Sequence, residues 1–528
     1  MEKAKVVVCD HIHNAGLEML KNDDAIDFVF AADIDKVSLL DVIADADVAI
    51  TRSSTDVDEK FISAAKNLKA IIRAGVGVDN VNIDGCSKEG IIVMNVPTAN
   101  TIAAVELTMT HMLSCMRMFP YSHDHLKNQR IWKREKWYGH ELKGKKLGII
   151  GFGNIGSRVG IRAKAFEMDV ITYDPYIHAN KATDLGVTYT ENFEDILACD
   201  IITIHTPKNQ ETLDMINSEE IAKMNDGVVL INCARGGLYN ESALYDGLKS
   251  GKVRFAGIDV FIKEPATDHP LLELDNICVS PHLGANTFES QYNIGTQAAQ
   301  QAIEAAKGIA FRNAFNLPID ESTTPAFVKP YFETAQKIGF LAAQINKSAL
   351  RSIKVTAQGE VSEYLQSLAT FVTVGSMSES LGENINYVNA EYVAEEKEIK
   401  IETESLPDSK MYKNLITVKI TTDKDVISIS ATIFNDNEAR IVDVNGFSLD
   451  IAPAGNMIFF KNTDVPGVIG HVGTILASHD VNIADFRLGR NNKSEALAII
   501  MTDNTVCPKT LKELSNLDAC ISVDYARI

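Results

Sequence analysis

The chain has 528 residues, of which 45% are hydrophobic and 23% are charged. This balance is typical of soluble globular proteins and argues against a disordered, collagen-like or coiled-coil chain. At about 150 residues per domain, the length predicts three or four domains rather than one. The 71 acidic and 51 basic residues give a net charge of -20, which disfavours nonspecific binding to nucleic acid or to anionic membrane surfaces.

The cysteines and the N-terminus indicate where the protein resides. The eight cysteines are scattered and form no CxxC pair or disulfide-like spacing, which favours reduced thiols. The segment MEKAKVVVCDHIHNAG lacks the charged and apolar regions of a secretory signal, and no apolar run reaches membrane-spanning length. We therefore expect a cytoplasmic protein with no membrane, nucleic acid or metal partner.

Two successive series of apolar runs predict two α/β sheets. The first consists of KVVVCD, AIDFVF, DVAITR, KAIIRAG and IIVMNV, separated by polar or helical stretches. The second begins with KLGIIGFGNIG and continues through DVITYD, DIITIHT, VVLINCARGG, AGIDVF and NICVSPH. Short runs rich in Val and Ile that alternate with helices are typical of parallel strands. Helical spacing of apolar residues from 101 to 118 predicts a long helix between the two series.

The pattern changes after a linker that we expect near residues 312–325. From about residue 350, runs such as SIKVTAQG, NLITVKITTD and VISISATIF alternate with a period of two, which predicts an α+β domain with antiparallel strands. From Pro453 onward, the order strand, turn, amphipathic helix, strand, strand predicts a small separate βαββ-type module.

A glycine-rich loop at residues 151–156 has the context of a dinucleotide-binding fingerprint. Gly151, Gly153 and Gly156 follow the apolar strand LGII and precede the helical stretch SRVGIRAKAF. Glycines permit a tight turn and close approach of pyrophosphate to a helix N-terminus. Asp174, 18 residues after Gly156, could bind the ribose diol and repel a 2′-phosphate, which favours NAD over NADP. The alternative is a structural turn with a capping aspartate.

Three polar side chains follow strands of the second series and form a candidate catalytic set. Arg235 follows VVLIN, Glu264 follows AGIDVF and His282 follows ICVS, so all three are expected at the same edge of the sheet. A guanidinium can hold a carboxylate, and a histidine can exchange the proton of a hydroxyl group. Separately, each also fits an ordinary structural role: a surface anion contact, a turn residue and a buried histidine.

The joint order of motifs is more specific. GFGNIG, NCARGG, DVFIKEP and SPHLGA, in that order, resemble the D-isomer-specific 2-hydroxyacid dehydrogenase family, and the resemblance covers essentially the whole chain. It implies an α/β fold with two Rossmann-like lobes around a cleft, followed by an α+β intervening domain and a βαββ-type ACT domain. The implied boundaries are 1–98 plus 287–312 for a flavodoxin-like substrate lobe, 99–286 for the NAD-binding lobe, 313–452 for the intervening domain and 453–528 for the ACT domain.

The resemblance also implies roles for individual residues. Arg235 would hold the substrate carboxylate and polarise the keto oxygen, His282 would be the acid/base, and Glu264 would orient His282. Asp259 would face the nicotinamide carboxamide. The residues that fall where relatives contact NAD are Gly151, Gly153, Asn154, Ile155, Gly156, Asp174, Thr206, Cys233, Ala234, Arg235, Asp259, His282 and Ala285.

A phosphorylated substrate needs local positive charge in so acidic a protein. Arg52 and Arg73 each follow a strand of the first series, and Ser53 adds a hydroxyl donor. The resemblance implies that Arg134 and Lys136 reach the active site of a neighbouring subunit. As a sequence pattern, their basic run fits a solvated charged stretch equally well.

The last 76 residues contain a candidate effector site. Asn462, Asp464 and Asn482 match positions that bind serine in regulated members of the family, and their amide and carboxylate groups suit an amino acid. The alternative is capping and turn chemistry in a domain that only dimerises.

The function implied by the resemblance is NAD-dependent oxidation of D-3-phosphoglycerate to 3-phosphohydroxypyruvate, the first step of phosphorylated L-serine biosynthesis. L-serine is the expected effector, and a homodimer or homotetramer is the expected assembly. Glyoxylate and hydroxypyruvate reductases share the motifs, although the two C-terminal domains argue against them. The alternative of another class is a non-catalytic NAD-sensing protein, which the complete set of Arg235, Glu264 and His282 disfavours.

Overall fold

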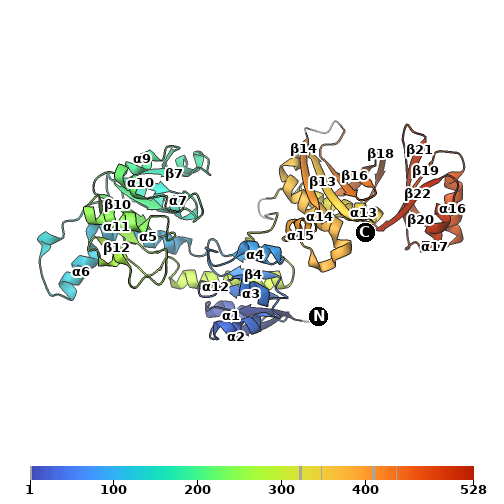
Figure 1. Ribbon diagram of the computed structural model, residues 1–528. Coiled ribbons are helices and arrows are strands. Elements are labelled where there is room, and N and C mark those ends of the chain that lie inside the picture. Colours follow the sequence, from blue (N-terminus) through green and yellow to red (C-terminus); the bar gives the residue numbers. More distant parts are fainter. Residues whose placement is uncertain (1–2, 320–323, 347, 407–410, 436) are drawn as a thin grey trace.

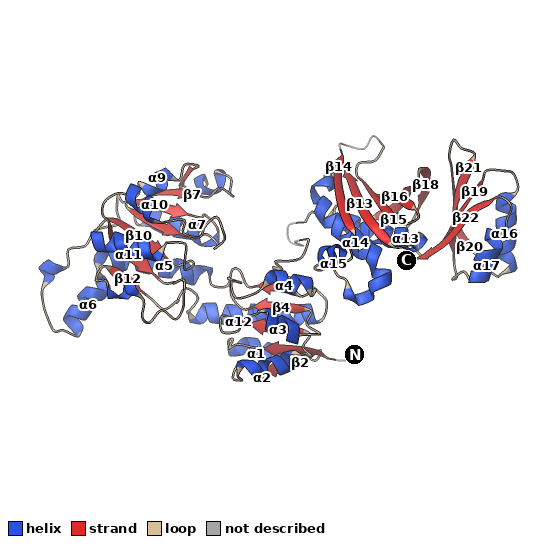
Figure 2. Ribbon diagram, in the orientation of Figure 1, coloured by secondary structure: helices blue, strands red, loops and turns tan. Residues whose placement is uncertain are grey.

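The computed structural model describes residues 3–319, 324–346, 348–406, 411–435 and 437–528. Over these residues the strands form four sheets, which follow one another along the chain (Figure 1). Figure 2 shows helices packed beside each sheet. The expected α/β organisation, with further sheets toward the C-terminus, is confirmed.

The first sheet has the strand order β2-β1-β3-β4-β5, and all its pairs are parallel. Its strands are β1 (Ala4–Val8), β2 (Ile26–Phe30), β3 (Val48–Thr51), β4 (Ala70–Arg73) and β5 (Ile92–Asn95). This order is the flavodoxin-like one. The helices beside it are α1 (Asn14–Lys21), α2 (Lys36–Ile43), α3 (Glu59–Ala64), α4 (Ile83–Lys88) and the returning α12 (Phe288–Ala306). We call this unit the substrate lobe.

The second sheet has the order β12-β11-β10-β9-β6-β7-β8, again all parallel. Its strands are β6 (Lys146–Ile150), β7 (Asp169–Tyr173), β8 (Thr188–Thr190), β9 (Ile201–Ile204), β10 (Val228–Asn232), β11 (Val253–Ile258) and β12 (Ile277–Val279). The order reverses between β6 and β9, where doubly wound sheets bind ligands. We call this unit the cofactor lobe.

The helices of the cofactor lobe include the long helix expected between the two series. It is α5 (Thr101–Arg117), and it ends where Met118 adopts a left-handed conformation with φ 48°. The others are α6 (Phe119–Lys127), α7 (Asn154–Ala165), α8 (Asn180–Thr183), α9 (Glu194–Leu197), α10 (Ser218–Lys223), α11 (Glu241–Ser250) and the 3-10 turns η1 (Arg134–Lys136) and η2 (Pro270–Glu273).

The chain passes between the two lobes twice, and the two connecting segments are in contact. The first runs through Ala99 into α5, and the second leads into α12, where Ser290 Oγ donates to Ala99 O at 3.3 Å. The cleft between the lobes therefore has both of its connections at one place.

The first part of the expected linker at residues 312–325 packs against the substrate lobe. Phe315 N donates to Val93 O at 2.8 Å, and Ala314 forms an antiparallel bridge with Met94 of β5. Residues 320–323 of the predicted linker lie outside the described residues. The segment up to residue 316 therefore belongs to the edge of the substrate lobe.

The third unit is the expected α+β domain. Its sheet has the order β14-β13-β15-β16-β17-β18, built from β13 (Leu350–Gln358), β14 (Lys400–Leu406), β15 (Leu415–Thr422), β16 (Val426–Phe434), β17 (Glu438–Val444) and β18 (Phe447–Ile451). Its helices are α13 (Lys329–Ile345), α14 (Leu365–Leu381) and α15 (Ala390–Glu396), with the 3-10 turns η3 (Glu360–Tyr364) and η4 (Gly382–Asn384). The antiparallel expectation was wrong for β13 and β14, which pair in parallel because α14 and α15 lie between them in the chain.

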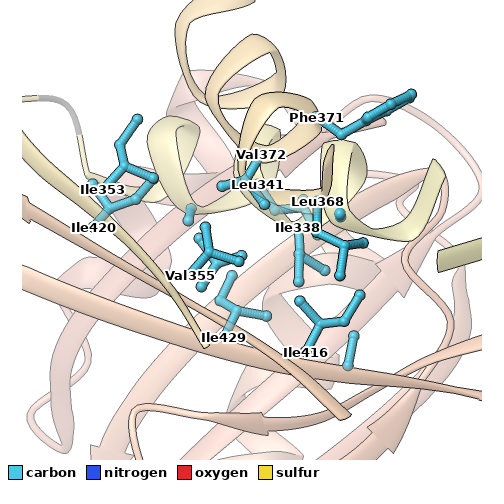
Figure 3. Packing of buried hydrophobic residues seen from close by; sticks show 14 of the residues in the cluster. Ile338, Leu341, Ile353, Val355, Leu368, Phe371, Val372, Ile416, Ile420 and Ile429 are labelled. Carbon is cyan, nitrogen blue, oxygen red and sulfur yellow. The ribbon is translucent and has the colours of Figure 1, made fainter. Parts of the chain in front are cut away.

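Figure 3 shows the core of this unit, where apolar side chains of two helices meet one face of the sheet. Ile338 and Leu341 of α13 pack with Val355 and Ile416, and all four are fully buried. The period-two alternation of the strands places these side chains on the helix-covered face.

The last sheet has the order β20-β21-β19-β22 and is antiparallel throughout. It contains β19 (Asn456–Thr463), β20 (Ile483–Arg490), β21 (Glu495–Thr502) and the helix α16 (Val468–Ser478). The predicted βαββ order omitted the last two elements of this module, α17 (Pro508–Ser515) and β22 (Cys520–Arg527). The result is a βαββαβ unit in which β22 completes the edge beside β19.

Two further findings concern membrane-spanning helices and the state of the cysteines. Within the described part of the chain, no helix combines the length and apolarity needed to cross a bilayer. All eight cysteines are free thiols.

Candidate active site

The predicted catalytic set lies at the carboxyl ends of neighbouring strands. Arg235 follows β10, Glu264 follows β11 and His282 follows β12, and these strands are adjacent in the sheet. Because parallel strands end at the same edge, residues 47 positions apart meet on one side of the cleft.

The histidine and the glutamate are in contact. His282 Nδ1 lies 2.7 Å from Glu264 Oε2, while Glu264 Oε1 accepts a hydrogen bond from Phe261 N at 3.0 Å. The backbone contact fixes the carboxylate, which in turn fixes the ring. With Nδ1 engaged, Nε2 is the ring nitrogen left to face a substrate.

The loop that carries His282 is held by Asp259, which is fully buried. Its carboxylate accepts hydrogen bonds from Ser280 Oγ (2.6 Å), Leu283 N (2.7 Å) and Gly284 N (3.0 Å). Its carbonyl accepts from His282 N at 2.9 Å, and His282 has the unusual φ of 55°. The family resemblance implied only a cofactor contact for Asp259. Its bonds to the loop could not be predicted from the sequence, because the bonded residues lie more than twenty positions away.

Arg235 spans the cleft. Its Nε lies 3.1 Å from Asp79 Oδ2 of the substrate lobe, and its Nη1 donates to Ala234 O at 2.7 Å. Asn232 braces the turn, since its side chain accepts from Ala234 N at 3.0 Å and donates to Arg235 O at 2.8 Å. A Cβ on Gly77 would lie 2.3 Å from Arg235 Nη2, so a larger residue there would displace the guanidinium. The sequence did not predict the pairing of Arg235 with Asp79.

Arg52 and Arg73 stand on the opposite wall, at the ends of β3 and β4. Burial, followed by the neighbouring cations Arg235 and Arg52, lowers the pKa of Arg73 to about 10, which leaves it charged at neutral pH. Arg73 Nε is buried without a hydrogen-bond partner in the described chain. A cationic group with unused donors beside two other guanidiniums is suited to an anionic ligand.

Arg52 is held more firmly than Arg73. Its Nη1 donates to His11 O at 3.1 Å and to Gln291 Oε1 at 3.0 Å, and its backbone N donates to the buried carboxylate of Asp10. Burial lowers the pKa of Arg52, while Asp10 acts against this change. Ser53 follows on the exposed side of the same turn.

Arg134 and Lys136 are not brought to this cleft within one chain. They form η1, which is exposed, and Lys136 Nζ lies 4.9 Å from the centre of the Trp137 ring. In Figure 1 the neighbouring helix α6 lies at the outer end of the cofactor lobe, away from the substrate lobe.

The glycine loop has the shape that a dinucleotide requires. Gly151 has φ 85°, and a Cβ on Gly156 would lie 2.1 Å from Gly151 O. A Cβ on Gly153 would meet no described atom within 4 Å, so the loop faces open space there. No side chain caps the N-terminus of α7, which begins at Asn154 and continues through Ile155. Its backbone N–H groups remain available for pyrophosphate.

The other predicted cofactor residues line the same edge of the sheet. Asp174 accepts hydrogen bonds from Phe152 N (2.8 Å) and Tyr176 N (3.0 Å), which hold its carboxylate at the end of β7. Thr206, after β9, has a buried hydroxyl with no partner among the described residues. Cys233 and Ala234 lie in the turn after β10, and Ala285 packs against the core of the substrate lobe. An uncapped helix, an open loop and an orphaned hydroxyl fit a bound dinucleotide.

The candidate effector residues bond to their own domain. Asp464 pairs with Arg490 at 3.1 Å, and Asn482 Nδ2 donates to Asp503 Oδ2 at 2.7 Å. Asn462 is buried, and its Nδ2 donates to Thr463 O at 2.7 Å. Asn462 and Asp464 lie at the end of β19 and just beyond it, and Asn482 precedes β20.

Two parts of the chain match models of known families. Residues 109–284 match the NAD binding domain of the D-isomer specific 2-hydroxyacid dehydrogenases, and residues 327–445 match the D-3-phosphoglycerate dehydrogenase intervening domain. The D-3-phosphoglycerate dehydrogenase of Bacillus subtilis is 38% identical over 98% of this chain and 98% of its own length. That of Archaeoglobus fulgidus is 36% identical over 99% of this chain and 100% of its own.

The chain belongs to the D-3-phosphoglycerate dehydrogenase family. The chain is therefore an NAD-dependent oxidoreductase, as the sequence predicted.

Solved structures agree over the catalytic part. D-lactate dehydrogenase from Aquifex aeolicus, complexed with NAD and lactic acid, has a TM-score of 0.53 and 29% identity over 58% of this chain and 96% of its own. The NAD-dependent formate dehydrogenase from Staphylococcus aureus, in complex with NAD, has a TM-score of 0.54 and 26% identity over 59% of this chain and 97% of its own.

Proposed function

We propose that this protein oxidises D-3-phosphoglycerate to 3-phosphohydroxypyruvate with NAD, the first step of phosphorylated L-serine biosynthesis. Similarity to D-3-phosphoglycerate dehydrogenases over nearly the whole chain carries this proposal. The cluster of Arg52, Arg73 and Arg235 supports it, because the substrate brings both a carboxylate and a phosphate. In a chain of net charge -20, such a cluster is the local exception that an anionic substrate needs.

The roles follow from the geometry of the cleft. Arg235 exchanges its contact with Asp79 for the substrate carboxylate, which a guanidinium can hold through two parallel bonds. His282 takes the proton of the C2 hydroxyl at Nε2, since Nδ1 is engaged by Glu264. The Glu264 carboxylate then lies beside the charged ring. Arg73 and Arg52, with Ser53, face the phosphate.

The cofactor would be held by the glycine loop with Asn154 and Ile155, by Asp174 at the ribose, and by Thr206, Cys233, Ala234, Asp259 and Ala285 along the strand ends. NAD supplies the acceptor for the hydride that leaves C2. The protein's own residues orient the substrate and move the proton.

A substrate panel tests this function. Purified protein with NAD should form NADH, measured by its absorbance, with D-3-phosphoglycerate. Activity confined to glyoxylate, hydroxypyruvate or lactate-type acids would assign the chain to another D-2-hydroxyacid dehydrogenase. NAD binding without turnover of any of these acids would favour a sensing role.

We further propose that the domains follow the boundaries 1–98 plus 287–312, 99–286, 313–452 and 453–528, except that residues 313–316 belong with the substrate lobe, on which they pack. The C-terminal pair of domains serves assembly and control in this proposal. In this proposal, L-serine is the effector and binds at Asn462, Asp464 and Asn482. The protein forms a homodimer or homotetramer in which Arg134 and Lys136 reach a neighbouring subunit. Its location is the cytoplasm. The eight free thiols support that location.

A further inference from the structure

His111 is a buried histidine that none of these roles uses. It lies on α5 with 3% of its surface exposed, and its Nε2 is 2.7 Å from Ser280 Oγ. Its Nδ1 is buried without a hydrogen-bond partner in the described residues, and burial lowers the pKa of the ring. The close approach of α5 depends on Gly257, where a Cβ would lie 2.9 Å from His111 Cβ. His111 is therefore a neutral ring directed at the catalytic loop.

The acceptor carboxylate of Asp259 determines which group donates in each hydrogen bond from His111 to Ser280 and from Ser280 to Asp259. The Asp259 carboxylate can only accept, so the Ser280 hydroxyl donates its single proton to Asp259 Oδ1 at 2.6 Å. The Ser280 oxygen must then accept from His111, which is the Nε2–H tautomer. We call this chain of hydrogen bonds, from His111 through Ser280 to the acceptor Asp259, the loop relay.

The loop relay ends at Asp259, which holds the backbone of His282 and of the two residues after it. Asp259 bonds Leu283 N and Gly284 N through its carboxylate and His282 N through its carbonyl. His282 has φ 55°, a conformation that a residue with a side chain keeps only when its surroundings impose it. Asp259 is fully buried and Ser280 is half-buried, so solvent replaces a missing donor only at a cost.

We propose that His111 is a positioning residue for the reaction. Through the loop relay, it holds the segment from Ser280 to Gly284 and thereby the ring of His282. This inference rests on the proposed function, in which His282 is the acid/base. Helix α5 starts at the crossing between the lobes, where Ala99 O accepts from Ser290 Oγ. The relay thus also ties the interlobe helix to the catalytic loop.

His111→Met, with His111→Gln as the conservative variant, tests the proposal. Methionine fills the space but donates no hydrogen bond, so we expect kcat to fall about tenfold to a hundredfold with a smaller change in the KM for NAD. Glutamine carries an amide N–H near the position of Nε2 and should recover much of the loss. Met112→Leu, at the next and fully buried position of α5, controls for altered packing and should keep the parental kcat.

An isotope effect separates positioning from a loss of folded protein. With D-3-phosphoglycerate deuterated at C2, His111→Met should show a larger primary isotope effect on kcat than the parent, because the chemical step is slowed. Ser280→Ala should behave similarly, and the double variant should be no slower than the worse single variant, since both interrupt one relay. If His111→Met does not fold, Ser280→Ala replaces it in the isotope measurement.

The outcomes distinguish this inference from the proposed function. An active parent, together with unchanged kcat and isotope effect in the folded variants or independent effects of the two substitutions, overturns the role of His111 alone. A parent that oxidises no 2-hydroxyacid overturns the proposed function and this inference with it.

Discussion

The catalytic half (residues 3–319) and the C-terminal half (324–528) use their polar side chains differently. In the catalytic half, Arg73 has a buried Nε without a partner among the described residues, and His282 is held at φ 55°. In the C-terminal half, Asp464 is paired with Arg490 and Asn482 with Asp503. In the cleft, Arg73 keeps an unused donor and only Arg235 must leave a partner, Asp79. The proposed effector would have to displace the existing partners of both Asp464 and Asn482. A ligand there gains only the difference between new and old bonds.

The strongest test of this contrast is His282→Asn. We expect kcat to fall by about 10²–10⁴-fold, because the substitution removes the group that takes the proton. NADH formation at saturating NAD and D-3-phosphoglycerate measures the change. Affinity for NAD, followed by fluorescence titration, should stay near the parental value. An unchanged kcat would remove His282 from the acid/base role.

Arg73→Gln should have the next largest effect. Losing a half-buried cation that faces the proposed substrate should raise the KM for D-3-phosphoglycerate about tenfold to a hundredfold, since a hydrogen bond to a charged group contributes about 1.5–3 kcal/mol. Unphosphorylated D-glycerate, tested in parallel, should be affected less. Equal losses for the two acids would contradict a phosphate contact. Arg312→Gln, outside the cleft and paired with Glu304, is the matched control.

Asp174→Ala tests the ribose contact. The ratio of kcat/KM for NAD over NADP should fall at least about tenfold, which corresponds to about 1.4 kcal/mol, because the repulsion of a 2′-phosphate is lost. Initial rates with both cofactors give the ratio. A preserved ratio would assign Asp174 only the turn contacts to Phe152 N and Tyr176 N.

Asn482→Ala tests the effector proposal in the C-terminal half. L-serine should slow the parent enzyme, and the variant should need a higher serine concentration for the same inhibition. Because Asn482 already bonds Asp503, we expect a shift of only about threefold to tenfold. A parent that is indifferent to serine would refute this assignment.

Leu341→Ala should have the smallest effect on turnover of these substitutions, although it should destabilise the intervening domain. Leu341 is fully buried in the core shown in Figure 3, so its truncation should cost about 2–5 kcal/mol of unfolding free energy. Denaturant unfolding measures this loss, and kcat at low temperature should stay parental. A large fall in kcat would show that the two halves are coupled more strongly than their cores suggest.

The sequence predicted those features that local pattern determines. The glycine loop, Arg235, Glu264 and His282 each follow a recognisable apolar strand, and strand ends of a parallel sheet meet without further information. The missed features depend on distant partners. Asp79 meets Arg235 from another lobe, and His111 reaches Ser280 from 169 residues away. Their spacing has no period, so no local rule could find them.

The C-terminal half is attached to the catalytic half through the substrate lobe. The chain leaves the catalytic half along β5, through the bond from Phe315 N to Val93 O. Beyond residues 320–323, Asn386 Nδ2 donates to Gly90 O at 3.0 Å, and Val388 packs into the substrate-lobe core. The intervening domain therefore contacts the substrate lobe directly, beside β5. A torque on the tail domains would reach the cleft through the wall that carries Arg52 and Arg73.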